Sequence, residues 1–136
     1  MVYLIKTEVK DPAARIFVIA EAKTMYGGKQ IAPGDTAYLF ASETQGGAGL
    51  VARTTVTAVA ATPRPRGVAR QTPRISVTLR RTASAKARLG RDQLKTFQKW
   101  QDGRPQTELN FKFYRQATNK IGGITERAAA FLEGHF

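Results

Sequence analysis

Short segments in which apolar and polar side chains alternate recur along this chain of 136 residues. In the clearest of them, Ile75, Val77 and Leu79 alternate with serine, threonine and arginine side chains. Successive side chains of a β-strand point to opposite faces, so this alternation predicts a strand with one buried face. Similar patterns predict strands at residues 2–8, 36–42 and 50–61. The sequence therefore favours a mainly β fold.

Two of these segments have apolar side chains on both faces. Residues 2–8 begin with VYLI, and in residues 36–42 Tyr38 and Phe40 share one face while Leu39 and Ala41 share the other. A strand that is apolar on both faces is expected to be central and covered from both sides. The Pro-Gly-Asp turn signal directly before residue 36 supports the start of a strand there.

Residues 12–23 are open to two interpretations. An Asp-Pro pair at residues 11–12 is typical of a helix start. The run IFVI at residues 16–19 is β-branched and aromatic, which favours a strand at residues 15–21. We expect the strand, because this run is the stronger signal.

The last third of the chain mixes both kinds of pattern. A short helix is predicted at residues 91–101, and alternating aromatic side chains predict a late strand at residues 111–115. A closing helix is expected from Thr125 as N-cap to Gly134 as C-cap. Five or six short strands with a few short helices indicate an α+β chain built around a small β-barrel, and its length fits one domain over residues 1–136.

The composition excludes several classes of site. The chain has no cysteine, and its one histidine, His135, lies next to the end. Disulfides, thiolate metal sites, cysteine nucleophiles and Ser-His-Asp triads are therefore not expected, and neither a metal nor a cofactor is predicted. The sequence also shows neither a signal peptide nor an apolar run long enough to span a bilayer, so a cytoplasmic protein without a membrane partner is expected.

Positive charge is concentrated in one third of the chain. The whole sequence has a formal net charge of +12, and residues 61–104 hold twelve basic but only two acidic side chains. Nine of these twelve cations are arginines, whose planar guanidinium pairs bidentately with phosphate. This segment predicts a nucleic-acid partner, either RNA or DNA. The residues expected to contact phosphates are Arg64, Arg66, Arg70, Arg74, Arg80 and Arg81.

Three stretches resemble the EVE domain and its relatives in the PUA-like superfamily, which includes the YTH and ASCH domains. They are the opening YLIKTE, the segment IAPGDTAYLFAS and the strand VARTTVTAV. Lys6, Thr7 and Glu8 match the family's Lys-Ser/Thr-Glu, while Gly34-Asp35 and Ser42 match the turn and the end of the next strand. The resemblance implies a PUA-like pseudo-barrel that binds RNA or DNA and often receives a flipped, modified base in an aromatic-lined pocket.

Several polar and aromatic residues are candidates for such a base pocket. Trp100 lies within the basic segment and suits a stacking platform, and the stretch FKFYRQATNK combines aromatic rings with groups that can read a base edge. A structural role for Trp100, as a core residue or lid, is an equally good interpretation. The predicted pocket residues are Lys6, Thr7, Tyr26, Ser42, Trp100, Tyr114, Arg115 and Asn119.

We therefore expect a nucleic-acid-binding module without catalytic residues, possessing a base pocket and an arginine-rich face. Two alternatives stay open. ASCH-type relatives include amidohydrolases, which makes Lys6 a conceivable nucleophile with Glu8 as acid or base, provided that the pKa of the lysine is lowered. The basic segment could instead bind an acidic protein.

Overall fold

The computed structural model describes residues 1–62, 67, 74–114 and 119–136. In these residues, six strands form a closed barrel in the order β1-β3-β4-β5-β2-β6. The strands are β1 (Val2–Thr7), β2 (Ile16–Met25), β3 (Thr36–Ala41), β4 (Gly49–Thr62), β5 (Arg74–Ser84) and β6 (Lys120–Gly123). The α+β barrel predicted from the sequence is confirmed, and the segment at 15–21 belongs to a strand.

The barrel closes through a short strand from late in the chain. β1 pairs with β3 in parallel and with β6 in antiparallel orientation, and β6 in turn pairs in parallel with Lys23–Met25 of β2. β3, β4, β5 and β2 follow one another by antiparallel pairing. Because β6 has only four residues, it covers only the last part of β2.

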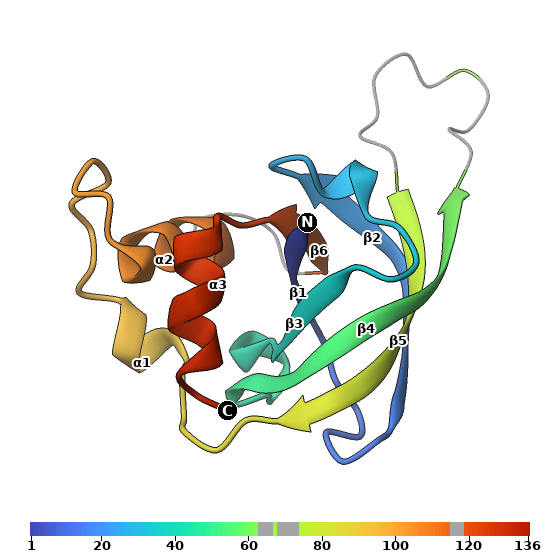
Figure 1. Cartoon of the computed structure of the whole chain (residues 1–136), viewed down its shortest axis with the longest axis horizontal. Coiled ribbons are helices and arrows are strands. Elements are labelled where there is room, and N and C mark those ends of the chain that lie inside the picture. Colours follow the sequence, from blue (N-terminus) through green and yellow to red (C-terminus); the bar gives the residue numbers. More distant parts are fainter. Residues whose placement is uncertain (63–66, 68–73, 115–118) are drawn as a thin grey trace.

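The helices lie on one side of the barrel, next to β1 and β3 (Figure 1). They are α1 (Arg91–Leu94), α2 (Pro105–Tyr114) and α3 (Glu126–Glu133), with short 3-10 turns at η1 (Gly28–Gln30) and η2 (Glu43–Gln45). The predicted caps of the closing helix are confirmed, since the Thr125 side chain accepts a hydrogen bond from the amide of Ala128 and Gly134 ends α3. Among the described residues, no helix has the length and apolarity that a membrane crossing requires.

Two apolar cores explain why β1 and β3 are apolar on both faces. Tyr3, Ile5 and Leu39 point into the barrel, whereas Leu4 and Phe40 pack against the helices. The barrel interior also receives Ile75, Val77 and Leu79 of β5, as the alternation predicted. Burial of such side chains is the main favourable contribution to the stability of the fold, at about 25 cal/mol per Å² of apolar surface.

The alternation of β4 holds only over its first half. Leu50, Ala52 and Val56 are buried as expected, but Ala58 and Ala60 are exposed. The pairing of β4 with β5 shifts in register between Val56 and Ala58. Such an irregularity bends a strand and changes which face its side chains share.

Two sequence predictions for the last third of the chain were wrong. Residues 111–114 belong to helix α2 rather than to a strand. Pro105 begins this helix, and the side chains of Leu109 and Phe113, spaced four residues apart, are both fully buried against the barrel. The helix predicted at 91–101 ends at Leu94. In both places tertiary packing outweighs the local preference of the sequence.

Candidate functional site

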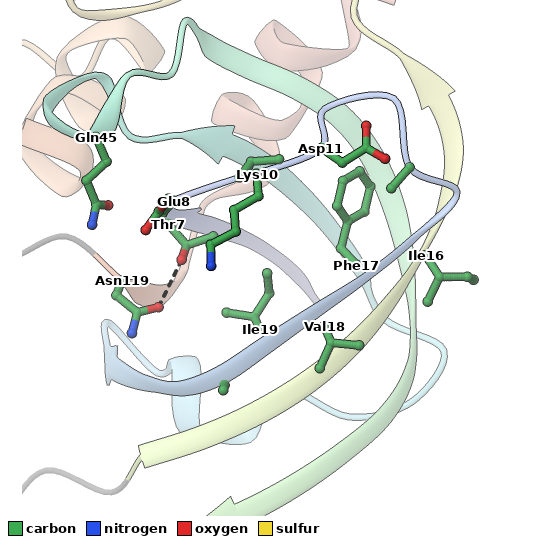
Figure 2. Close-up of a pocket in the computed structure, with 13 residues that line it drawn as sticks. Thr7, Glu8, Lys10, Asp11, Ile16, Phe17, Val18, Ile19, Gln45 and Asn119 are labelled. Carbon is green, nitrogen blue, oxygen red and sulfur yellow. Dashed lines mark hydrogen bonds between the residues drawn. The ribbon is translucent and has the colours of Figure 1, made fainter.

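A cavity of about 460 Å³ opens at the end of β1. Its walls come from the loop between β1 and β2, from the first half of β2, and from Gln45 and Asn119 (Figure 2). The volume lies within the range of small-ligand pockets, which is about 300–1,000 Å³. The cavity is therefore large enough for a planar heterocycle such as a nucleobase.

One end of the cavity is polar. The Thr7 hydroxyl donates a hydrogen bond of 3.0 Å to Oδ1 of Asn119 (Figure 2). Asn119 adopts a left-handed conformation with φ 61°, which asparagine tolerates better than most residues, and its carbonyl accepts from the amide of Lys23 at 3.0 Å. The side-chain oxygen and the backbone carbonyl of Asn119 are both held by these bonds, and its side-chain amide nitrogen can donate to a ligand.

The floor of the cavity is apolar. Phe17 and Ile19 point inward and are buried, whereas their neighbours Ile16 and Val18 point outward and are 52% and 71% exposed (Figure 2). This is the two-residue alternation of a strand. The cavity thus combines a polar end with an apolar floor, as a base pocket requires.

One edge of β2 borders the cavity without a strand partner. Residues 16–19 pair with β5 on their other edge, and β6 pairs only with residues 23–25. In the described part of the chain, no strand pairs with this edge at residues 16–20. Backbone amides and carbonyls at such an edge can bind polar groups of a ligand.

Arg81 holds the loop that forms the rim of the cavity. Its Nε donates to the carbonyl of Ala14 at 2.9 Å, and its terminal nitrogens donate to the carbonyl of Pro12 and to the Ser84 hydroxyl. The guanidinium also lies 5.2 Å from the centre of the Phe17 ring. A residue predicted to contact phosphate is thus engaged in positioning the pocket wall.

Lys6 lies on the opposite side of β1 from this cavity. Its Nζ donates to the carbonyl of Phe113 at 3.2 Å and sits 4.2 Å from the centre of the Tyr114 ring. The Tyr114 hydroxyl donates to Glu43 at 2.5 Å. Burial lowers the pKa of Lys6, and the Glu43 carboxylate opposes this shift. Burial and the bond to Glu43 raise the pKa of Tyr114.

These contacts join the end of α2 to β1. A cation near the carbonyl groups at a helix C-terminus is stabilised by the helix dipole. Glu8, the proposed acid or base partner of Lys6, is exposed and lines the cavity instead. Lys6 and Glu8 are therefore not brought together in one pocket.

Two solved structures share this architecture. The DUF55 domain of human thymocyte nuclear protein 1 aligns over 98% of this chain and 97% of its own, with a TM-score of 0.68 and 14% identity. Human THYN1 protein in complex with 5-methylcytosine containing DNA aligns over 98% of this chain and 95% of its own, with a TM-score of 0.65 and 15% identity. This chain has the PUA-like fold of EVE domains. No protein-family model and no curated protein sequence matches it.

The PUA-like barrel brings only some of the predicted pocket residues together. Thr7 and Asn119 line the cavity. Ser42 lies next to it, where its amide donates to the carbonyl of Thr7 at 2.8 Å. Lys6 of β1 contacts Tyr114 at the end of α2, away from this cavity, and Arg115 is outside the described residues.

Tyr26 and Trp100 lie elsewhere, and each is near Phe111. The ring centres of Tyr26 and Phe111 are 6.2 Å apart, and those of Trp100 and Phe111 are 5.6 Å apart. Neither Tyr26 nor Trp100 lines the cavity at the end of β1. The sequence predicts one pocket for these two aromatic residues together with Thr7 and Asn119, whereas in the structure they lie apart from that pocket.

The predicted phosphate contacts are described only in part. Arg74 and Arg80 lie on β5, where Arg74 donates to the carbonyl of Glu21 at 3.2 Å and Arg80 is exposed. Arg64, Arg66 and Arg70 are outside the described residues. In the described part of the chain, no cluster of three or more histidine or acidic side chains is placed to hold a metal ion.

Phe17 and Ile19 line the cavity but are not among the pocket residues predicted from the sequence. The run IFVI at residues 16–19 predicts a strand. That one edge of this strand borders a cavity depends on the short β6, which pairs only with residues 23–25 of β2. The alternation of β2 could have identified which of its side chains point inward, though not that they form the floor of a cavity.

Proposed function

We propose that this chain binds nucleic acid and accepts one extruded base, in particular a modified cytosine, in the cavity at the end of β1. The observation that carries the proposal is the cavity itself, with Thr7 and Asn119 at its polar end and Phe17 and Ile19 on its floor. It is supported by the shared fold with a protein solved in complex with 5-methylcytosine containing DNA.

The chemistry of the lining suits cytosine. The Asn119 amide can donate to the ring nitrogen or carbonyl of the base, and the Glu8 carboxylate can accept from its exocyclic amine. A methyl group at carbon 5 would gain apolar contact with Phe17 or Ile19, comparable to the contacts that proteins make with the methyl group of thymine. Extrusion costs a few kcal/mol of stacking and pairing, which these contacts must offset.

The direct test is the affinity for short DNA duplexes with and without one 5-methylcytosine, measured by fluorescence anisotropy. We expect tighter binding of the modified duplex, and we expect Asn119→Ala to weaken it by about tenfold or more, because a buried hydrogen bond contributes about 1–2 kcal/mol. The control is Gln30→Ala, which removes an exposed amide on η1 that does not line the cavity.

The proposal is wrong if Asn119→Ala and Gln30→Ala bind both duplexes as tightly as the unchanged protein does. Thr7→Val gives a second test, since it keeps the shape of the side chain but removes the hydroxyl that orients Asn119. It should weaken the binding of both duplexes, because the ring nitrogen and carbonyl that Asn119 would contact are shared by modified and unmodified cytosine. Single-stranded RNA and DNA probes of the same sequence would then identify the preferred nucleic acid.

A further inference from the structure

A second cavity lies on the helical side of the molecule and shares no residue with the first. Its volume is about 680 Å³, and it lies between α2, the start of α3 and the loop that precedes α2. The proposed function makes no use of it. Its lining combines aromatic and charged residues.

The aromatic wall of this cavity includes Trp100, which is 40% exposed. Phe111 contacts the Trp100 ring edge-on, at an interplanar angle of 66°, and therefore supports the indole from one side. An exposed indole held in this way is a platform on which a base can stack.

The charged wall of the cavity is mostly basic. Arg104, Arg127 and Lys112 line it, together with one carboxylate, that of Glu108. Nη1 of Arg127 donates to the carbonyl of Gly103 at 2.8 Å, and Gly103 directly precedes Arg104 in the chain. Two arginines that line one cavity favour an anion such as phosphate.

The Glu108 carboxylate is fully engaged within the protein. It accepts from the amide and hydroxyl of Thr125 and from Nζ of Lys112. Burial opposes its ionisation, but these bonds outweigh burial and hold the pKa of Glu108 below its usual value. With Glu108 and Lys112 paired, the charge left for a ligand comes from Arg104 and Arg127.

We propose that this cavity is a second binding site, which takes a nucleotide with its base against Trp100 and its phosphate at Arg104 and Arg127. The juxtaposition of an exposed indole with two arginines is the reason for choosing a nucleotide over an acidic peptide, which would satisfy the arginines but leave the flat aromatic wall without a matching ring. The proposal does not depend on the function of the first cavity.

Trp100 is the single tryptophan of the chain, so intrinsic fluorescence reports on this cavity directly. Adenosine 5′-monophosphate should quench it saturably. Adenosine lacks the phosphate and should bind more weakly by about tenfold or more, because charge-assisted hydrogen bonds contribute about 1.5–3 kcal/mol each. A short oligodeoxyadenosine strand is the third probe. If this strand binds more tightly than the mononucleotide, the natural ligand of the cavity is nucleic acid. If it does not, the ligand is a free nucleotide.

Two variants separate this site from the first. Arg104→Gln combined with Arg127→Gln should weaken the mononucleotide by about tenfold or more, and Asn119→Ala should leave its binding unchanged. Should the double variant fail to fold, Arg104→Gln alone provides the same comparison. The proposal is overturned by the absence of saturable quenching, by equal affinities for adenosine and its monophosphate, by arginine variants that bind normally, or by quenching with an oligoglutamate peptide alone.

Discussion

Lys120 is a charged residue at a fully buried position. It pairs in register with Lys6 across β1 and β6, so the two side chains share one face of the sheet. Burial, and secondarily the charge of Lys6, lower the pKa of Lys120 to about 8. Above about pH 8 the folded protein therefore holds Lys120 as the neutral amine, whereas in the unfolded chain it is an ordinary lysine with a pKa of 10.5.

This difference predicts a pH dependence of stability. Between about pH 8 and 10.5 the unfolded state binds more protons at Lys120 than the native state does, so this residue makes the free energy of unfolding rise with pH. Below pH 8 the destabilisation is fully present, at roughly 2–3 kcal/mol. In Lys120→Met this rise should shrink to the part that the lowered pKa of Lys6 contributes, as measured by urea denaturation across this range.

The control for this experiment is Lys29→Met, which changes an exposed lysine on η1. It should keep the pH profile of the unchanged protein. A Lys120→Met profile that runs parallel to the unchanged protein throughout would contradict the lowered pKa.

At the scale of elements, one side chain of β5 determines the position of the loop between β1 and β2. Arg81 reaches the carbonyls of Ala14 and Pro12, and this loop forms the rim of the first cavity. We expect Arg81→Gln to accelerate amide hydrogen exchange at residues 9–15, to destabilise the protein by about 1–3 kcal/mol and to weaken base binding.

Arg80→Gln is a matched control for this prediction, since Arg80 is the preceding residue on the same strand but is exposed on the other face. Its hydrogen exchange over residues 9–15 should equal that of the unchanged protein. Equal exchange in both variants would mean that Arg81 does not hold the loop.

The basic segment at residues 61–104 is expected to act at the scale of the whole molecule, because it places most of the net charge of +12 in one third of the chain. Each phosphate neutralised by a cation releases counterions, so nucleic-acid affinity should fall steeply as salt increases. Arg64→Ser, Arg66→Ser and Arg70→Ser should each reduce the slope of log affinity against log salt by about 1.

Lys29→Ser removes one cation outside the basic segment and should leave that slope unchanged. Affinities measured by anisotropy at several salt concentrations provide the comparison. If the arginine variants and Lys29→Ser show the same slope as the unchanged protein, this segment does not contact phosphates.

Local sequence patterns were sufficient to predict the features that depend on neighbouring residues. The buried faces of β1, β3 and β5 follow from the alternation of their side chains, and the two caps of α3 follow from Thr125 and Gly134. The basic segment at residues 61–104 can be located by counting charged side chains along the sequence. Together with the resemblance to EVE domains, these local signals were sufficient to predict the PUA-like barrel.

Which residues share a pocket depends on contacts between segments that are distant in the sequence. Thr7 and Asn119 meet although they are 112 residues apart, because β6 returns the chain to β1. The same packing makes residues 105–114 a helix against the barrel and places Trp100 in a different cavity from Thr7. Contacts between distant segments depend on the three-dimensional course of the backbone, and local periodicity carries no information about it.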